Sequence, residues 1–275
     1  MSRRDDGGRK LPIVISQGEP AGIGPEIAIK AWMALSGAID GRALRLIGSA
    51  KTFHNAAVFS GIDSAGLAGA IIDTGKEVHC APGRPAKDNA AAVTAAIEQG
   101  VRACQKGEAA ALVTAPIHKA VLTEAGFGFP GHTEFLAALT GTERAVMMLA
   151  SSEAEPPLRV VPFTVHLPLK DVFAQLDANA IAATGLVTIE ALARDFGCAR
   201  PRLAIAGLNP HAGEEGTMGR EDLDIIAPAV AKLRAMGHIV LGPLPADTLF
   251  HEDARKTYDA ALCMYHDQAL IPIKT

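Results

Sequence analysis

The sequence predicts a mainly parallel α/β protein, and three observations support this prediction. Short apolar runs alternate with helical segments along the 275 residues, which is the pattern of strands joined by crossover helices. The apolar runs lack the alternation of half-exposed strands, so both of their faces should be buried. Hydrophobic residues make up 49% of the chain and charged residues 20%, which suits one large or two medium globular domains.

The composition excludes several classes of protein. The net charge is −4, from 30 acidic and 26 basic side chains, so we expect neither a nucleic-acid binder nor a membrane-surface protein. The four cysteines lie far apart and form no C-x-x-C pair, which is typical of reduced thiols in a cytoplasmic protein. Residues 1–10 are polar and charged, without the apolar core of a signal peptide. We expect them to form a disordered tail.

The first strand, residues 11–16, runs into a glycine-rich turn at residues 18–26, and a helix follows to about Leu35. Pro25 suits the first helical turn. The spacing excludes a phosphate loop, because no Gly-Lys-Ser/Thr follows and Ile27 stands where G-x-G-x-x-G needs its third glycine. A tight structural turn and a ligand-facing loop remain equal alternatives for this segment.

The next elements follow from apolar runs and helix-ending glycines. A glycine-rich loop at residues 126–131 leads into a helix that starts with His132, Thr133 and Glu134 and runs to about Leu139. Free backbone N–H groups at such a helix start favour anion binding, although a simple cap by Thr133 is an equal alternative. Before this loop we expect strands at residues 44–48, 70–73 and 109–114 and a helix at residues 86–106.

The second half of the chain repeats the alternation. Residues 269–275 have an apolar, strand-like pattern with no helix after them. Taking the loop at residues 126–131 as a hinge, we expect a first α/β lobe at residues 11–138 and a second at residues 139–275, with a cleft between them. In the second lobe we expect strands at residues 145–150, 158–165, 203–208, 239–242 and 260–265, and helices at residues 178–196 and 221–236.

Three of these strands carry a histidine at or just past their C-terminal end: His166, His211 and His266. Ligands bind at this edge of parallel α/β sheets, so three imidazoles there indicate a metal site with positions left open for a substrate. A lone histidine is more often structural, and it is the shared context that favours ligands here. Imidazoles select zinc, cobalt or nickel over magnesium, although a nearby Asp247 or Asp267 would shift this preference.

Four motifs, in order along the chain, resemble a single family. They are Gly18-Glu-Pro-Ala-Gly-Ile-Gly-Pro-Glu26, Gly131-His-Thr-Glu134, Asn209-Pro-His-Ala-Gly-Glu214 and Met264-Tyr-His-Asp-Gln268. Together they resemble the 4-hydroxythreonine-4-phosphate dehydrogenase family, the PdxA group of pyridoxal phosphate (vitamin B6) biosynthesis. The resemblance spans essentially everything after residue 10. It implies a homodimer of chains with two α/β/α lobes, in the fold of isocitrate and isopropylmalate dehydrogenases.

The resemblance also implies which residues form the site. A divalent metal (zinc, cobalt or magnesium) would be held at the dimer interface, and the substrate would be bound by a His-Thr pair and a lysine. From the residues alone, we would expect the lysine to be a solvated surface side chain. Two aspartates are our candidates for the general base or for a carboxylate that orients a ligand histidine. The matching residues are His166, His211 and His266 for the metal, His132, Thr133 and Lys274 for the substrate, and Asp247 and Asp267 as catalytic candidates.

The implied reaction is oxidation of 4-phosphooxy-L-threonine at its 3-hydroxyl by NAD or NADP, followed by decarboxylation to 3-amino-2-oxopropyl phosphate. A metal would lower the pKa of the hydroxyl and stabilise the enolate formed on loss of CO2. The nearest alternative is a paralogous dehydrogenase acting on 4-phospho-D-threonate or 4-phospho-D-erythronate. From the residues alone, a metal-dependent hydrolase and a non-catalytic metal-binding protein also remain, because the chain has no complete G-x-G-x-x-G.

The chain departs from the family pattern at three places. Glu19 stands where the family usually has Asp, and Ala269 stands where Gly usually follows His-Asp-Gln. The family also continues beyond Thr275 with an Asn and an Arg for the substrate and much of the NAD pocket. We therefore expect the native protein to be longer, with its NAD-contacting residues mostly beyond Thr275.

Overall fold

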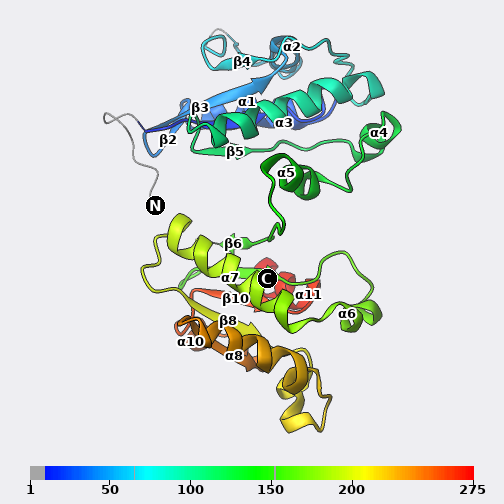
Figure 1. Ribbon diagram of the computed structural model, residues 1–275. Coiled ribbons are helices and arrows are strands. Elements are labelled where there is room, and N and C mark those ends of the chain that lie inside the picture. The colour runs from blue at the N-terminus through cyan, green and yellow to red at the C-terminus, as the bar shows by residue number, and fades with distance from the viewer. Residues whose placement is uncertain (1–9, 65, 152) are drawn as a thin grey trace. The chain divides into compact units, whose positions relative to one another are not determined.

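The computed structural model describes residues 10–64, 66–151 and 153–275 (Figure 1). Residues 1–9 of the predicted tail lie outside the described residues. The contacts divide the chain into an N-terminal unit that ends at Ala145 and a C-terminal unit that begins at Val146. Residues 139–145 therefore go with the N-terminal unit, because helix α5 (His132–Thr140) continues past the expected boundary and contacts α3 (Ala90–Gln105).

The N-terminal unit contains a mostly parallel sheet centred on β1 (Ile13–Ser16). This strand pairs in parallel with β3 (Arg42–Gly48) on one side and with β5 (Ala111–Val113) on the other. β3 also pairs in parallel with β4 (Ile71–Asp73) and, at its start, antiparallel with β2 (Ala38–Ile39). The remaining elements are α1 (Gly24–Ala34), α2 (Ala50–Phe59), η2 (Lys87–Asn89), α3, α4 (Lys119–Glu124) and α5.

Helices cover both faces of this sheet (Figure 1). Ile15 of β1 packs with Ile29 of α1 and Phe53 of α2. The preceding residue, Val14, packs on the other face with Ala96 of α3. Successive strand residues point to opposite faces, so apolar residues in a row build two cores at once. This unit thus has the α/β/α layering predicted from the unalternated apolar runs.

The glycine-rich loop after β1 is a packed structural turn. Gly18 has φ +67°, and a Cβ there would lie 2.4 Å from the carbonyl oxygen of Pro116. Glu19 is only 2% exposed, and its Oε1 accepts hydrogen bonds from the Ala21 N–H at 3.1 Å and from Asn89 Nδ2 at 2.7 Å. Of the two alternatives for this loop, these contacts favour the structural turn.

The C-terminal unit contains a second sheet, in the order β6-β7-β10-β8-β9. All neighbours are parallel except β6 and β7. The strands are β6 (Leu149–Ser151), β7 (Leu158–Pro162), β8 (Arg202–Ala206), β9 (Ile239–Leu244) and β10 (Ala260–Cys263). The helices are α6 (Leu169–Gln175), α7 (Ala178–Asp195), η3 (Pro210–Gly216), η4 (Asp222–Ile226), α8 (Ala227–Ala235), α9 (Ala246–Leu249), α10 (Glu252–Arg255) and α11 (His266–Lys274).

Side-chain size separates the two faces of this second sheet. Ile205 of β8 packs with Ile189 of α7 and Leu233 of α8. The neighbouring Ala204 faces the opposite side and packs with Leu270 of α11. Small residues on that face leave room for α11, so this unit is also an α/β/α sandwich. Within the described part of the chain, no single helix is long and apolar enough to cross a membrane, and only α6 and α7 together, bent by 93°, meet the length and composition criteria.

Several predicted strands extend beyond the observed ones, and the segments at residues 145–150 and 269–275 are the clearest departures. The strand expected at residues 145–150 is confined to Leu149–Ser151, because only these residues form ladder bonds with β7. The strand-like pattern at residues 269–275 belongs to helix α11. Its apolar residues Ala269, Leu270 and Ile273 lie on one helix face at i, i+1 and i+4 and pack against the sheet. The helix expected at residues 221–236 also differs, because it opens with the π-helical turn η4.

Candidate active site

The three strands that precede the candidate metal ligands are neighbours in one sheet. Ala261 of β10 pairs in parallel with Val160 of β7 on one side and with Ala204 of β8 on the other. Since parallel strands end at the same edge, the segments that follow β7, β10 and β8 leave the sheet side by side. These segments carry the three histidines, as the sequence predicted.

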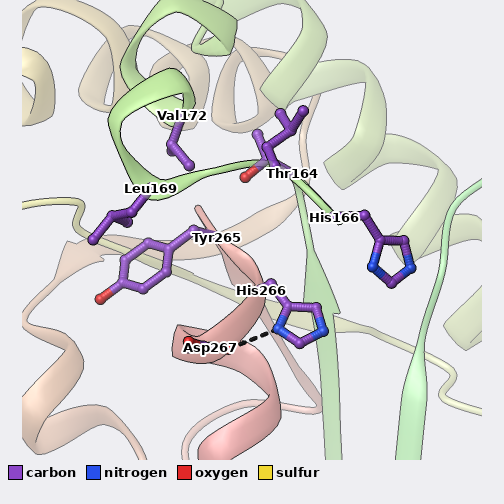
Figure 2. Close-up of a pocket in the computed structure, with 8 residues that line it drawn as sticks. Thr164, His166, Leu169, Val172, Tyr265, His266 and Asp267 are labelled. Carbon is purple, nitrogen blue, oxygen red and sulfur yellow. Dashed lines mark hydrogen bonds and ion pairs between the residues drawn. The ribbon is translucent and has the colours of Figure 1, made fainter.

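His166 and His266 face each other at this edge (Figure 2). Their ring centroids are 5.7 Å apart, with an angle of 43° between the planes. Both rings line one pocket, between the end of β7, the start of α6 and the start of α11. The residues that line this pocket are Thr164, His166, Leu167, Leu169, Val172, Tyr265, His266 and Asp267.

Asp267 holds the ring of His266 in place. Its Oδ1 lies 2.7 Å from Nδ1 of His266 (Figure 2). A carboxylate at this distance keeps the proton of a neutral imidazole on Nδ1 and leaves Nε2 free to bind a ligand. The side chain of Asp267 is 70% exposed, so the contact orients the ring without burying a charge. This geometry orients the ring of His266 and leaves its Nε2 exposed to the pocket.

His211 stands in a strained turn after β8. Each residue from His211 to Glu215 has a positive φ, between 42° and 79°. A run of left-handed residues other than glycine costs roughly 1–2 kcal/mol per residue, so the surroundings must hold this turn in its conformation. The side chain of His211 is exposed and is not part of the pocket that His166 and His266 line.

The donors suit a metal, although the set is not closed within one chain. Neutral imidazoles are ligands for zinc, cobalt and related ions, and two of them share a pocket beside a carboxylate. Among residues 10–64, 66–151 and 153–275, no group of three His, Cys, Asp or Glu side chains lies close enough together to hold an ion. The structure thus gathers His166 and His266, with His211 carried by the neighbouring strand end.

Buried hydrogen bonds tie the three strand ends together. Oγ1 of Thr164, after β7, donates to the carbonyl oxygen of Met264 at 2.8 Å. Oε1 of Gln268 accepts from the Met264 N–H at 2.6 Å, while its Nε2 donates to the carbonyl oxygen of Gly207, after β8, at 2.7 Å. Sequence reasoning missed the role of these residues, although polar side chains directly after apolar strands were a visible signal.

The remaining candidates of the C-terminal unit are exposed. Asp247 lies in the short helix α9, which contacts the η3 segment that carries His211. Lys274 lies in the last turn of α11, the helix that begins with His266. Elements that start or end at the histidine-bearing edge therefore present both side chains to solvent.

His132 and Thr133 open helix α5 in the N-terminal unit. Nε2 of His132 is buried and has no hydrogen-bond partner among the described residues. Burial also lowers the pKa of His132, which favours the neutral ring. Thr133 is exposed and makes no cap bond, because the N-cap position belongs to Gly131. The ring nitrogen is therefore a buried polar atom without a partner among the described residues, which is uncommon outside functional positions.

Three phenylalanines hold the loop in front of this helix. The ring centroids of Phe127 and Phe129 lie 5.0 Å and 5.1 Å from that of Phe135, which is on α5. Their tilted and edge-on arrangements are favourable for aromatic pairs. The cluster anchors the glycine-rich loop at residues 126–131 to the helix that His132 begins.

Comparison with known proteins identifies the family of the chain. Residues 38–275 match the family model described as pyridoxal phosphate biosynthetic protein PdxA. The chain is 50% identical over 274 residues to a 4-hydroxythreonine-4-phosphate dehydrogenase of Roseobacter denitrificans, covering 96% of this chain and 82% of the relative. An enzyme of the same name from Caulobacter vibrioides is 48% identical over 279 residues, with the same two coverages.

The fold is shared with solved structures as well. A crystal structure of 4-hydroxythreonine-4-phosphate dehydrogenase from Klebsiella pneumoniae superposes with a TM-score of 0.85 at 35% identity, over 96% of this chain and 84% of that one. This likeness confirms the predicted fold, which is that of isocitrate and isopropylmalate dehydrogenases. From the family model and from these identities, the chain belongs to the PdxA family of pyridoxal phosphate biosynthetic proteins.

Proposed function

We propose that the chain is a 4-hydroxythreonine-4-phosphate dehydrogenase, a metal-requiring oxidoreductase that uses a nicotinamide cofactor in pyridoxal phosphate biosynthesis. The observation that carries this proposal is one sheet edge, where the segments that follow three neighbouring parallel strands carry His166, His211 and His266. The relatives of the chain carry that name. The substrate is 4-phosphooxy-L-threonine, which is oxidised at its 3-hydroxyl and then decarboxylated. The cofactor is NAD, with NADP as the alternative.

His166, His211 and His266 would hold one divalent cation, zinc, cobalt or magnesium. When bound, this ion would lower the pKa of the substrate hydroxyl and stabilise the negative charge that develops on decarboxylation. Asp267 fixes the ring of His266 through Nδ1. That leaves the exposed Asp247, on the helix that contacts η3, as the proposed base for the hydroxyl proton.

The substrate phosphate and its neighbouring oxygens are proposed to lie against His132, Thr133 and Lys274. His132 offers an unpaired ring nitrogen at a helix start, and Lys274 adds a flexible point charge. A neutral His132 donates or accepts a hydrogen bond without adding a second full charge. Binding at the phosphate end positions the hydroxyl for proton removal.

The chemistry balances in two steps. Carbon 3 of the substrate gives a hydride to NAD+, and its hydroxyl gives a proton to the base, which leaves a β-keto acid. The carboxyl group then departs as CO2, and the carbanion that remains takes up a proton to give 3-amino-2-oxopropyl phosphate. Asp247 can return this proton, because it took one up in the first step.

A second copy of the chain is proposed to complete the metal site. Only two of the three imidazoles share a pocket in one chain. Leu167, Leu169 and Phe173, directly after His166, are 42%, 60% and 48% exposed, as expected for a surface that a partner covers. We therefore propose a homodimer. We also propose that the protein is cytoplasmic. Sedimentation at micromolar concentration should give twice the chain mass of 28.5 kDa, and a monomer with full activity would contradict the homodimer.

The test of the function is NADH formation by the purified protein. We expect turnover with 4-phosphooxy-L-threonine, loss of turnover on chelation, and recovery on adding zinc or cobalt. 4-Phospho-D-threonate and 4-phospho-D-erythronate are the matched alternatives, since they differ around the amine and not at the phosphate. A preference for 4-phospho-D-threonate or 4-phospho-D-erythronate would assign the chain to a paralogous activity. Inertness towards all three substrates with both nicotinamide cofactors would refute the proposal.

A further inference from the structure

Asp222 is a buried carboxylate directed at the loop between β8 and His211. The residue is 0% exposed and opens the π-helical turn η4. Its Oδ1 accepts from the Leu208 N–H at 2.8 Å, and its Oδ2 accepts from the Asn209 N–H at 3.1 Å and from Asn209 Nδ2 at 3.0 Å. One side chain therefore fixes two successive backbone positions just before His211.

The residues around Asp222 are closely packed against that loop. A Cβ at Gly207 would lie 2.8 Å from Oδ1 of Asp222 and 2.8 Å from Cα of Ala212. A Cβ at Gly213 would lie 3.3 Å from Oδ2 of Asp222 and 2.9 Å from the carbonyl oxygen of Gly219. Asp222 thus touches the loop both before and after His211, where the backbone is in its strained left-handed run. Strained segments keep their conformation only when their surroundings over-determine it.

A second side chain links this loop to the strand that carries His266. Gln268 accepts from the Met264 N–H and donates to the Gly207 carbonyl oxygen, so it spans the ends of β10 and β8. Gln268 therefore holds Gly207, and Asp222 holds the next residue, Leu208. These two hydrogen bonds connect the first turn of α11 and the π-helical turn η4 to adjacent residues just before the His211 turn.

The geometry points to Asp222 as a positioning residue that holds the His211 turn so that its imidazole can share one metal ion with His166 and His266. This inference rests on the proposed function, which makes His211 a ligand. Asp222 acts through the Leu208 and Asn209 amides and touches neither substrate nor metal. The π-helical turn lets the carboxylate reach the loop, a placement that π-turns often serve near functional sites.

A merely structural role for Asp222 predicts a different outcome. A buried group that only stabilises the fold would, when changed, lower the melting temperature and leave the metal affinity of the folded protein intact. A positioning role predicts a loss of metal affinity that exceeds any general loss of stability. Groups outside the ligand shell commonly change affinity by about 10–100-fold when substituted.

The matched control is Asp177, a helix N-cap in the same unit. Asp177 accepts from the Ala180 N–H at 2.8 Å at the start of α7, so it too satisfies backbone donors with a carboxylate. Asp177→Ala removes a stabilising contact that involves neither the His211 turn nor a proposed ligand. It reports the effect of general destabilisation on metal binding.

The experiment compares zinc affinity, by competition with a chelating indicator, in the wild type, Asp222→Asn and Asp177→Ala. In Asp222→Asn the amide nitrogen must face the donors of one carboxylate oxygen, so at least one of the three bonds is lost. We expect zinc affinity to fall roughly 10–100-fold, and kcat to fall while KM for NAD is unchanged. Asp177→Ala should lower the melting temperature and keep the zinc affinity. Affinity within twofold of the wild type in Asp222→Asn, or an equal loss in Asp177→Ala, would overturn the inference.

Two further measurements keep the test decisive. If Asp222→Asn does not fold, Gln268→Met removes the link to Gly207 and should weaken zinc binding in the same direction. Amide hydrogen exchange of the metal-free protein should be faster at residues 208–217 in either variant than in the wild type. A wild type that binds no zinc would refute the proposed function, and faster exchange at these residues would still support the positioning of the turn. Unchanged exchange would reject the role of Asp222.

Discussion

Glu19 in the N-terminal unit and Asp222 in the C-terminal unit are both buried carboxylates that hold a loop after a parallel strand. Glu19 accepts from one backbone N–H and from Asn89, and Asp222 accepts from two backbone N–H groups and from Asn209. The loop that Glu19 holds is packed against Pro116. The loop that Asp222 holds presents an exposed histidine.

The two sites use one structural device for different ends. In both, a carboxylate replaces the water that would otherwise satisfy buried backbone donors. At Glu19 the result is a rigid turn, with one carboxylate oxygen, Oε2, left unpaired among the described residues. At Asp222 the result is a strained turn that carries a proposed ligand. A buried carboxylate at a strand end therefore indicates that the loop is held in one conformation. Whether that loop serves a binding site is indicated by the side chain that the loop exposes.

The largest expected effect comes from His211, the exposed side chain of the loop that Asp222 holds. His211→Ala should abolish metal retention in elemental analysis, because it removes one of three proposed ligands. The loss of several kcal/mol of Lewis-acid stabilisation should lower kcat by at least about a thousandfold. His251→Ala is the matched control, since His251 caps the short helix α10. Unchanged metal content in His211→Ala would move the site elsewhere.

Lys274→Ala should have the next largest effect. It distinguishes a contact with the substrate phosphate from a contact with the nicotinamide cofactor. Loss of a charged contact worth about 1.5–3 kcal/mol should raise KM for the phosphorylated substrate roughly tenfold to a hundredfold. KM for NAD should stay within about twofold if this lysine contacts only the phosphate. Steady-state kinetics with each substrate varied in turn would check this. A change confined to the NAD constant would assign the lysine to the wrong ligand.

Glu19→Ala sharpens the contrast with Asp222. It strips Ala21 and Asn89 of a buried acceptor and should lower the free energy of unfolding by about 1–3 kcal/mol. Zinc affinity should remain that of the wild type, because the loop carries no proposed ligand. Glu19→Gln keeps an acceptor oxygen and should cost less. Urea denaturation and zinc titration of both variants would check this. A weakened zinc affinity would contradict the claim that only the loop held by Asp222 affects metal binding.

The smallest effect concerns the pH dependence of stability at His132. Burial lowers the pKa of this ring, whereas the unfolded chain keeps a value of about 6.5. Between the two values the unfolded state binds more protons, so this contribution is present above about pH 6.5 and is lost as pH falls through the lowered pKa. His132→Gln should flatten this part of the stability profile. His54→Gln, at an exposed position of the same unit, should leave it unchanged.

Much of the fold could be predicted because buried parallel strands leave a clear sequence pattern. The apolar run at β10 has no alternation, and all four of its residues are buried. The same reasoning failed at α11, where the apolar run at residues 269–273 is equally compatible with a buried strand. Only the packing against the sheet decides between a helix face and a strand face in so short a segment. The antiparallel edge strand β6 was too short to leave a pattern of its own.

The exposed candidates of the site could be predicted, whereas the side chains that hold them could not. His166 and His266 follow apolar strands, and the structure places their rings 5.7 Å apart. The partners of Asp222 and Gln268 lie far along the chain, at Leu208 and Gly207. No local spacing encodes such contacts, because they depend on the strand order β10-β8 and on the π-helical turn of η4. The roles of the exposed candidates as metal, substrate and catalytic residues stay predictions.

The most direct test of the central claim is X-ray absorption spectroscopy of the zinc-loaded wild type beside His211→Ala. The account predicts three imidazole nitrogens at about 2.0–2.1 Å from zinc in the wild type, with oxygen ligands filling the open positions. In His211→Ala the imidazole scattering should fall, with most of the zinc lost. A wild-type spectrum with sulfur at about 2.3 Å, or imidazole scattering that is the same in both proteins, would contradict a metal held by His166, His211 and His266.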